Sequence, residues 1–423
     1  MGQVSAANSG TPVGIDALGD GVVAIDVGEY AVCVIKVDTT VWCWGTSLYP
    51  LPLAYPNERG LPAQVQGLPN DIVKVVTSMW HACALRQSGT VLCWGKGELE
   101  QLSGQLGPKI VSVAFTPTVI SGVTNVIDIA TNKDNVCVRL ANGSAQCWGS
   151  NYWGQLGNGT GVNYPFPSGT PAEVQVFNQP VLSVATGGYH TCAVTDSNGA
   201  VCWGANNYGQ LGNGTVSHVI TEAVPVHSVT SGITTLSAGE HHSCALTAGG
   251  AVWCWGRNTH GQIGTGTNVD SSTPVSVTGL ISGVQAIAAG FNHTCALIIN
   301  GTLRCWGANS VGELGSGTTV SNVIPYPVVV QGLEGRRVLT VTAHALHTCA
   351  IVEGGSAHCW GSNNYGQLGI PKPPIFSTTP VTVTGLTSGT TAISAGNGHT
   401  CAVVNGSAVL GMGCEWRIGE RYK

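Results

Sequence analysis

The chain has 423 residues, of which only 9% are Asp, Glu, Lys or Arg, and its formal net charge is −5. A typical soluble protein carries about 25% charged residues. No cluster of basic residues is present, which excludes the usual footprint of a nucleic-acid-binding protein. No apolar run approaches the ~20 residues that span a bilayer, and the first ten residues lack the basic start and apolar core of a secretion signal.

After an N-terminal extension, expected to cover residues 1–10, the chain divides into similar units. The segment TPVGIDALGDGVVAIDVG at 11–28 resembles TPVSVTGLISGVQAIAAG at 273–290. Self-similarity at a fixed period is typical of repeat architectures. We predict one domain of eight units over residues 11–414, with the last unit incomplete, and a tail at 415–423 that lies outside the pattern. The units begin near residues 11, 61, 116, 170, 224, 273, 326 and 379.

Each unit is predicted to contain four short β-strands. In the sixth unit, apolar residues alternate in four runs separated by glycine-rich turns, which is the pattern of strands rather than helices. The runs span residues 274–277, 284–288, 293–298 and 302–306. Four strands per unit at this period are the signature of a β-propeller blade. We therefore expect an all-β protein, a β-propeller of four-stranded blades.

Two cysteines ten positions apart mark each of the first seven units. If Cys244 and Cys254 face each other across a hairpin, residues 248–250 form its turn, and the last turn position favours glycine because its backbone is left-handed. In the fourth unit we expect Gly199 in this role. Directly opposed Cα atoms, ~4.5–5.5 Å apart, are within disulfide reach. The pairs are Cys33–Cys43, Cys83–Cys93, Cys137–Cys147, Cys192–Cys202, Cys244–Cys254, Cys295–Cys305 and Cys349–Cys359.

Three interpretations of the cysteine pairs are open. Seven disulfides, one in each hairpin, indicate an oxidising compartment, whereas buried free thiols indicate a reducing cell. Zinc needs four convergent ligands and a hairpin supplies two, so no metal site is expected. Pairwise recurrence without a lapse favours the disulfides. Cys401 opens an eighth pair, and whether it bonds Cys414, thirteen positions later, stays open.

A histidine precedes the first cysteine by two positions in six units, and a tryptophan follows the second cysteine in seven. We expect the imidazoles to be buried and to bond the backbone of a neighbouring blade. Strand alternation places each tryptophan on the face opposite the sulfurs, where it suits packing between blades. The histidines are His81, His190, His242, His293, His347 and His399. The tryptophans are Trp44, Trp94, Trp148, Trp203, Trp255, Trp306 and Trp360.

The stretch AAGFNHTCALIINGTLRCWGANSVGELGSG at 288–317 resembles the repeat of the chromosome-condensation-regulator family. The matching features are the His-Thr pair, the small apolar strand, the Trp-Gly pair and the loop Asn-x-x-Gly-Gln-Leu-Gly, which reads NYWGQLG at 151–157. The resemblance covers nearly the whole chain. It implies a propeller, usually of seven blades, that works by binding partners on its faces, so seven blades and eight are both open.

The resemblance also implies two kinds of function. The nuclear founder of the family is an exchange factor for a small GTPase and touches chromatin, whereas its β-lactamase-inhibitor relatives are secreted and clamp an enzyme with loops on one face. Paired cysteines, scarce charge and the lack of a basic tail fit the secreted or cell-surface, bacterial-like branch. We therefore expect an extracellular or cell-surface binding or assembly module that is not an enzyme. Its expected partner is a protein, a cell-surface macromolecule or a second copy of itself, with no nucleic acid, cofactor or membrane span.

The loops that vary between units are the candidate binding surface, because rigid repeat scaffolds carry their function on loops. Tyrosines in adaptable loops are typical of recognition surfaces, although such rings can also merely cover the ends of blades. The large rings of these loops are Tyr49, Tyr55, Tyr164, Phe166 and Phe376.

Two alternatives stay open. One is an intracellular exchange-factor-like propeller with reduced cysteines. The other is an enzyme with its site at the channel of the propeller, for which Glu240 and His241 are the candidate residues, since neither belongs to the repeat.

The chain leaves the repeat pattern after Leu410 and becomes unusually charged. We interpret this change as a reading-frame shift in the gene. Codons permitted for residues 410–416 can, read one base later, spell Trp-Gly-Trp-Gly-Ala-Asn-Gly, which is close to what the repeat demands. The coding DNA tests this interpretation.

Overall fold

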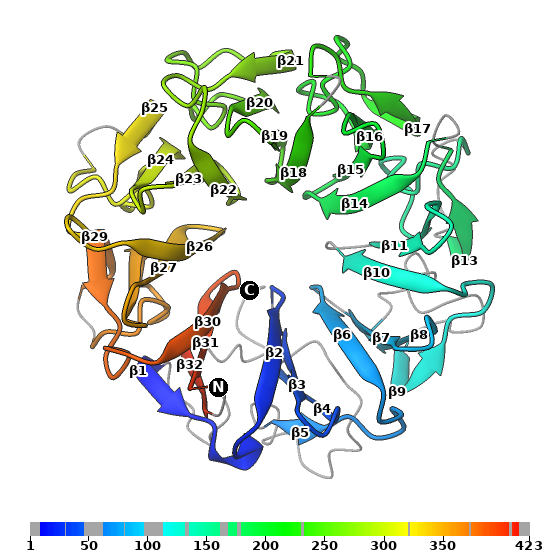
Figure 1. The fold of residues 1–423 in the computed structure, drawn as a ribbon, viewed down its shortest axis with the longest axis horizontal. Helices are drawn as coiled ribbons and strands as arrows, with labels where there is room; N and C mark the ends of the chain where they lie inside the picture. The colour runs from blue at the N-terminus through cyan, green and yellow to red at the C-terminus, as the bar shows by residue number, and fades with distance from the viewer. Residues whose placement is uncertain are drawn as a thin grey trace, which may run out of the picture.

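Eight four-stranded antiparallel sheets are arranged around a central axis in the computed structural model, like the blades of a propeller (Figure 1). This confirms the predicted all-β propeller and selects eight blades over seven. The structure describes residues 9–29, 31–45, 62–79, 81–96, 113–131, 135–160, 168–175, 179–229, 232–319, 322–371, 374–405 and 408–413. Within these residues no helix is both long enough and apolar enough to cross a membrane.

The blades are numbered from 1 to 8 in chain order, and the strands of each are given from the axis outward. Blades 1 to 4 are β2 (Val22–Val27), β3 (Ala31–Lys36), β4 (Val41–Gly45), β5 (Ala63–Gln64); β6 (Ile72–Thr77), β7 (His81–Arg86), β8 (Val91–Lys96), β9 (Val113–Val119); β10 (Val126–Thr131), β11 (Asn135–Leu140), β12 (Ala145–Gly149), β13 (Ser168–Glu173); and β14 (Val181–Thr186), β15 (His190–Thr195), β16 (Ala200–Ala205), β17 (Val219–Pro225). Blades 5 to 8 are β18 (Ile233–Ala238), β19 (His242–Thr247), β20 (Val252–Gly256), β21 (Ser271–Ser276); β22 (Val284–Ala289), β23 (His293–Ile298), β24 (Leu303–Ala308), β25 (Val323–Val329); β26 (Val338–His344), β27 (His347–Val352), β28 (Ala357–Ser362), β29 (Phe376–Thr382); and β30 (Thr390–Ala395), β31 (His399–Val404), β32 (Ala408–Gly413), β1 (Ser9–Gly14). A 3-10 helix, η1 (Asp16–Leu18), connects β1 to β2.

The blades are out of phase with the sequence units by one strand. The first strand of each unit is the outermost strand of the preceding blade: β21, at the start of the sixth unit, pairs with β20 of blade 5. The incomplete eighth unit is consequently completed from the other end of the chain, because β1 pairs with β32 (Figure 1). Residues 9 and 10, which we assigned to an N-terminal extension, lie in this closing strand.

Seven disulfides staple the hairpins between the second and third strands. Cys244 pairs with Cys254 in the ladder, flanked by the pair Ala245 and Trp253, as direct opposition requires. The two Cα atoms of each disulfide lie 4.1 or 4.2 Å apart. Gly250 adopts the expected left-handed conformation, with φ at 76°. In blade 4 the residue in this conformation is Asn198 (φ 56°) rather than Gly199, since asparagine also tolerates the left-handed region.

Blade 8 lacks this disulfide. Cys401 is a buried free thiol, and the residue opposite it in the ladder is Gly411, not a cysteine. Cys401 therefore takes no part in the possible Cys401–Cys414 disulfide. Cys414 itself lies outside the described residues. Met412 is fully buried at the place where the other blades have their tryptophan. β32 therefore fills the position of the third strand with a different sequence.

Neighbouring blades pack sulfur against indole. One core cluster combines Cys192 and Cys202 of blade 4 with Ala245 and Trp255 of blade 5. Six of the seven repeat tryptophans have exposed fractions of 0%. Burying an aromatic side chain of this size is among the largest single contributions to a core. The predicted packing of the tryptophans between blades is confirmed.

A chain of hydrogen bonds also joins neighbouring blades. His242 Nε2 of blade 5 lies 2.8 Å from Thr294 Oγ1 of blade 6, and this hydroxyl donates to the carbonyl oxygen of Gln262 in blade 5. The Trp306 indole N–H of blade 6 donates to the same carbonyl. The prediction of a backbone partner for these histidines is therefore wrong, because a hydroxyl lies between the imidazole and the backbone. Equivalent chains are His190–Ser243–Gln210–Trp255 and His293–Thr348–Glu313–Trp360.

Candidate functional site

The rings predicted to bind a partner lie mostly outside the described residues. This holds for Tyr49, Tyr55, Tyr164 and Phe166. Phe376 is described: it is the first residue of β29, lies opposite Ser362 of β28 and is half-buried. Its position at the start of an outer strand is compatible with either predicted role, and its part in binding stays a prediction.

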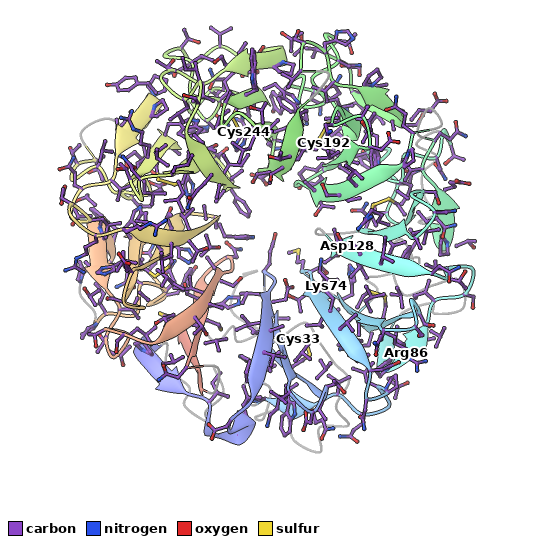
Figure 2. All side chains as sticks on the ribbon, viewed as in Figure 1. Cys33, Lys74, Arg86, Asp128, Cys192 and Cys244 are labelled. Atoms are coloured by element: carbon purple, nitrogen blue, oxygen red, sulfur yellow. A yellow bond between two sulfur atoms is a disulfide. The ribbon has the colours of Figure 1, made fainter. Side chains whose placement is uncertain are left out.

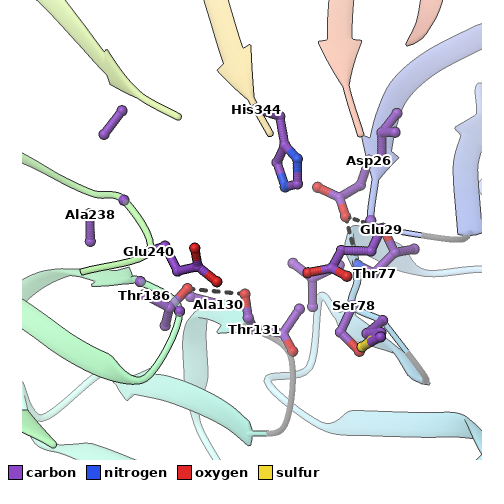
Figure 3. Close-up of a pocket in the computed structure, with 18 of the residues that line it drawn as sticks. Asp26, Glu29, Thr77, Ser78, Ala130, Thr131, Thr186, Ala238, Glu240 and His344 are labelled. Atoms are coloured by element: carbon purple, nitrogen blue, oxygen red, sulfur yellow. Dashed lines mark hydrogen bonds between the residues drawn. The ribbon is translucent and has the colours of Figure 1, made fainter. Parts of the chain in front are cut away.

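The first strand of every blade ends, and the second begins, on one face of the propeller, because successive strands alternate in direction. In blades 1 to 7 the third strand ends on this same face, whereas β32 and β1 of blade 8 come from opposite ends of the chain. We call this the loop face; the stapled hairpin turns lie on the opposite face. At its loop-face end, the central channel holds a cavity of about 380 Å³. The cavity is lined by the ends of the innermost strands and by the connections that follow them, in seven of the eight blades (Figure 3).

Carboxylates line opposite sides of this cavity. Asp26 and Glu29 come from blade 1, and Glu240 comes from blade 5 across the opening (Figure 3). Among the described residues of the lining, one basic side chain is ordinarily charged: Lys74, whose ammonium group lies 2.7 Å from a carboxylate oxygen of Asp128 (Figure 2). The positive charge of Lys74 is therefore compensated by the Asp128 carboxylate on the neighbouring blade. The described lining carries a net negative charge.

Asp26 joins blade 1 to blade 2. One of its carboxylate oxygens accepts hydrogen bonds of 2.6 Å from both the backbone N–H and the hydroxyl of Thr77. Burial raises the pKa of Asp26, while these two bonds and the nearby Lys74 act in the opposite direction. This carboxylate therefore joins two blades, and Glu29 and Glu240 are the other acidic residues of the described lining.

The side chains of Glu240 and His241, considered above as catalytic candidates, lie in different surroundings. Glu240 lines the cavity, whereas the ring of His241 packs on the rings of blade 4. The ring centroids of His241 and Tyr189 lie 5.7 Å apart and the rings are nearly parallel, at 21°. This arrangement suits a binding surface better than a general acid–base pair, in which both groups would converge on one substrate atom.

His241 belongs to a row of rings that crosses the loop face from blade 3 to blade 5. Trp153 of blade 3 contacts Tyr189 and His218 of blade 4, with centroids 5.6 and 4.9 Å apart. Tyr208 of blade 4 lies 5.2 Å from His241. We call this set the ring ridge; its members are Tyr152, Trp153, Tyr189, Tyr208, His218 and His241.

The sequence contains a signal for the ring ridge that the variable-loop argument does not use. Tyr189 and His241 stand directly before the repeat histidine of their units, and Trp153 and Tyr208 stand directly before the glycine of the Gly-Gln-Leu-Gly loop. Both positions vary among the units, whereas the histidine or glycine that follows them recurs. Comparing the units position by position would have placed these rings on one face, because equivalent positions of all blades lie at equivalent places in the ring.

The described residues offer no group of three or more His, Cys, Asp and Glu placed to hold a metal ion. Four repeat histidines, His190, His242, His293 and His347, are instead buried in the hydrogen-bond chains between blades. Burial lowers the pKa of His190, His242 and His347 to about 3, with nearby histidines adding to the effect. These imidazoles are neutral at physiological pH and act as structural donors.

Comparison with known proteins identifies the family. The model of the RCC1-like domain matches residues 1–345, and that of the Regulator of chromosome condensation (RCC1) repeat matches residues 354–403. The chain belongs to the RCC1 repeat family. RCC1-like propellers are typically used for protein binding and exchange-factor roles rather than for catalysis.

Two curated relatives illustrate how much of this chain is shared. It is 33% identical over 236 residues to the ultraviolet-B receptor UVR8 of Arabidopsis thaliana, covering 55% of this chain and 52% of UVR8. It is 29% identical over 283 residues to the human E3 ubiquitin-protein ligase HERC2, covering 62% of this chain and 6% of HERC2. The chain therefore spans about half of UVR8 and a small part of HERC2.

Solved RCC1-type structures share the fold. Human WBSCR16 superposes with a TM-score of 0.67 at 19% identity, covering 88% of this chain and 94% of WBSCR16. Yeast RCC1 (Prp20), in its complex with Kap60, superposes with a TM-score of 0.66 at 19% identity, covering 95% of this chain and 91% of that one. At this identity the likeness establishes the fold alone.

Proposed function

We propose that this RCC1-type propeller is an extracellular or cell-surface binding module without catalytic activity, which holds a macromolecular partner on its loop face. The observation that carries the proposal is the set of seven hairpin disulfides. Disulfides persist in oxidising compartments and are rare in the cytosol. Their number and regularity support a chain that folds and works outside the reducing cell.

The surface composition supports a binding role. With 9% charged residues, the chain has few charges to keep copies of itself or other proteins apart. Its partner is a protein or a cell-surface macromolecule, or a second copy of the chain. The variable segments at 158–169 and 370–378 are the loops that we expect to contribute to this contact.

A thiol count tests the compartment. The protein purified from its native host is denatured without reductant, alkylated and weighed by mass spectrometry. We expect fourteen cysteines to resist alkylation, those of the seven hairpins, and to react only after reduction. Sixteen reactive thiols before reduction would refute the extracellular assignment and favour the intracellular exchange-factor alternative. Prp20p of Saccharomyces cerevisiae, which shares the fold, binds Gsp1p and histones.

A capture experiment tests the binding role. Three proteins are immobilised and exposed to the surface proteins of the host: the wild-type chain, a variant with residues 158–167 replaced by Gly-Ser and a variant with residues 370–375 replaced in the same way. The replaced residues are the parts of the two segments that precede β13 and β29. We expect a protein retained by the wild type and lost from at least one loop variant. Equal retention by all three proteins would contradict the assignment of binding to these loops.

A further inference from the structure

The ring ridge and the cavity of the channel form one continuous surface. Glu240 lines the cavity and the next residue, His241, is in the ring ridge; in the same way Gly188 lines the cavity and is followed by Tyr189. The inner end of the ridge therefore lies at the rim of the cavity. Away from the axis, the ridge continues over blades 4 and 3 as far as Trp153 and Tyr152, whose centroids lie 5.1 Å apart.

We propose that this surface binds a basic segment of a protein partner, which lies along the ring ridge and inserts a lysine or arginine side chain into the cavity. The proposal rests on the proposed function in one respect, since it takes the partner to be a polypeptide. Beyond the proposed function, it specifies that the bound segment of the partner is basic and that the segment binds at the ring ridge and the cavity.

The charge of the cavity selects a cation. Among the described lining residues, Glu29 and Glu240 stand on opposite sides, and the basic Lys74 is paired with Asp128. Recessed surfaces that carry one sign of charge between low-dielectric walls focus the field and concentrate ions of opposite sign. A cavity of about 380 Å³ lies at the small end of the range for ligand sites, so it admits one long side chain rather than a folded element.

The rings favour the same sign of charge independently of the carboxylates. The faces of aromatic rings are electronegative and attract ammonium and guanidinium groups within about 6 Å of the centroid. The ridge already holds one cation in this way, because the guanidinium carbon of Arg257 lies 5.0 Å from the centroid of Tyr208. At the far rim of the cavity, Phe291 and His344 form another ring pair with centroids 5.1 Å apart.

The extent of the ridge indicates a polypeptide rather than a small cation. A free polyamine would need only the cavity and its carboxylates as a binding site. The ridge in contrast spans three blades, from Trp153 to His241, and much of it lies beyond the cavity lining. Such a row of rings offers contact area to the residues that flank an inserted lysine or arginine, and rigid aromatic contacts of this kind dominate many protein interfaces.

The test uses a labelled decapeptide of alternating glycine and arginine, with a glycine–glutamine decapeptide as the neutral probe, and the full chain. Binding is followed by fluorescence anisotropy at two salt concentrations. We expect the arginine peptide to bind, the glutamine peptide not to bind at the same concentration, and the affinity to fall with salt because the groups attract by charge. Equal binding of both peptides would overturn the proposal.

Two variants locate the site. Glu29→Gln with Glu240→Gln removes two charges at unchanged shape and should weaken binding at least about tenfold, since each lost charge contact costs on the order of 1 kcal/mol or more. Tyr189→Leu should weaken binding about threefold to tenfold through the lost ring face. The matched control is Asp196→Asn with Glu353→Gln, which changes the net charge equally at exposed turns on the opposite face.

Each remaining outcome decides the question. If the control variant weakens binding as much as the cavity variant, or if the cavity variant binds like the wild type, the site is not the channel and the proposal is refuted. If spermine displaces the peptide at equal charge concentration and Tyr189→Leu has no effect, the occupant is a small cation and the polypeptide is refuted. A folded state for each variant is established beforehand from its thermal midpoint. None of these outcomes alters the thiol count, so the proposed compartment stands or falls separately.

Discussion

The buried histidines set the pH dependence of the whole molecule. His242 is fully buried, and its pKa in the folded chain is lowered to about 3, largely by desolvation. The unfolded chain binds a proton at this residue below about pH 6.5. Because the unfolded state then holds more protons than the folded state, stability is lost as the pH falls from about 6.5 towards 3. His190 and His347 act in the same direction, so we expect acid unfolding to be steep.

Replacing one histidine should remove one proton from this transition. In His242→Asn, the free energy of unfolding should fall by about 1–3 kcal/mol at pH 7.5 through the weakened bond to Thr294. Its slope below pH 6 should be smaller than the wild-type slope by up to about 1.4 kcal/mol per pH unit. Urea unfolding at a series of pH values measures both effects. The control is His227→Asn, at an exposed residue; an unchanged slope in His242→Asn would contradict this account.

Glu313 is predicted to act in the opposite direction. It replaces the glutamine that the equivalent loops have at Gln210, Gln262 and Gln367, and its side chain is fully buried. Its carboxylate accepts hydrogen bonds from the Val311 backbone N–H and the Ser310 hydroxyl. Burial nevertheless raises its pKa above the usual 4.5. The neutral acid is therefore favoured in the folded chain, and this contribution is complete below about pH 4.5 and is lost as the pH rises through the raised folded pKa.

The variant Glu313→Gln should raise the thermal midpoint at pH 7.5 by a few degrees, because it restores the amide of the other blades without a buried charge. The gain over wild type should shrink as the pH falls to 4.5, where the carboxyl group becomes neutral. Differential scanning calorimetry at both pH values measures the change, with Glu353→Gln at an exposed turn as the control. A midpoint gain that is independent of pH would show that charge is not the cause.

At the scale of the hairpin, the spacing of the cysteines determines register. A constant ten-residue separation requires one turn length, and the structure has that register in all seven stapled blades, down to the pairing of Leu246 with Val252. The turn residue is less predictable. Glycine is the residue type that this turn position prefers, but the register places Asn198 rather than Gly199 at the left-handed position. Counting from the cysteine is therefore a better guide than looking for the nearest glycine.

Blade 8 offers a test of what a staple contributes. Gly411 lies directly opposite the free thiol of Cys401, in the same register as the native disulfides. The variant Gly411→Cys should form an eighth disulfide and stabilise the oxidised protein by about 2–3 kcal/mol, as expected for closure of a short loop. Mass spectrometry should find one reactive thiol fewer than in the wild type, because the new bond consumes the Cys401 thiol, and the gain in thermal midpoint should vanish on reduction. The double variant Gly411→Cys with Cys401→Ala is the control, and it should show no reduction-dependent change in midpoint.

The strands were predictable, but their grouping into blades was not. The runs 284–288 and 293–298 of the sixth unit correspond to β22 and β23 within one residue. The run 274–277 is also a strand, β21, yet it belongs to the preceding blade. A linear repeat has no natural starting point, because each unit bonds equally well to the strand before and the strand after it. Only the pairing across the two ends of the chain shows where one blade stops.

At the scale of the whole molecule, the ring depends on β1. This strand bonds β32 through the pairs Val13–Gly411 and Gly14–Leu410, and it supplies the outer strand of blade 8. Deleting residues 1–14 should expose the edge of β32 and destabilise the protein by several kcal/mol, since an unpaired edge and an incomplete core are left. Hydrogen exchange with mass spectrometry should show faster exchange in blades 8 and 1 and unchanged exchange in blade 5. Uniformly unchanged exchange would mean that the ring does not need this strand.

The candidate site is a property of the closed ring, which explains why the sequence reveals it only in part. Glu29 and Glu240 are more than two hundred positions apart in the chain and come together because blades 1 and 5 lie across one channel. No local motif records such a pairing. Glu240 stood out in the sequence because it is a titratable residue outside the repeat, whereas Tyr189 and Trp153, also at variable positions, are single rings that form no local motif. Their significance depends on neighbours contributed by other blades.

The pairing of β1 with β32 also has a consequence for biosynthesis. β1 is the first strand of this propeller to be translated, but it can join a sheet only after β32, the last strand, has been synthesised. The intervening blades can assemble and form their disulfides as the polypeptide emerges, but the ring stays open until residue 413 has been synthesised and released. We expect quality control of this protein to act at that final step, when a missing or misplaced β1 leaves the ring open with unpaired strand edges.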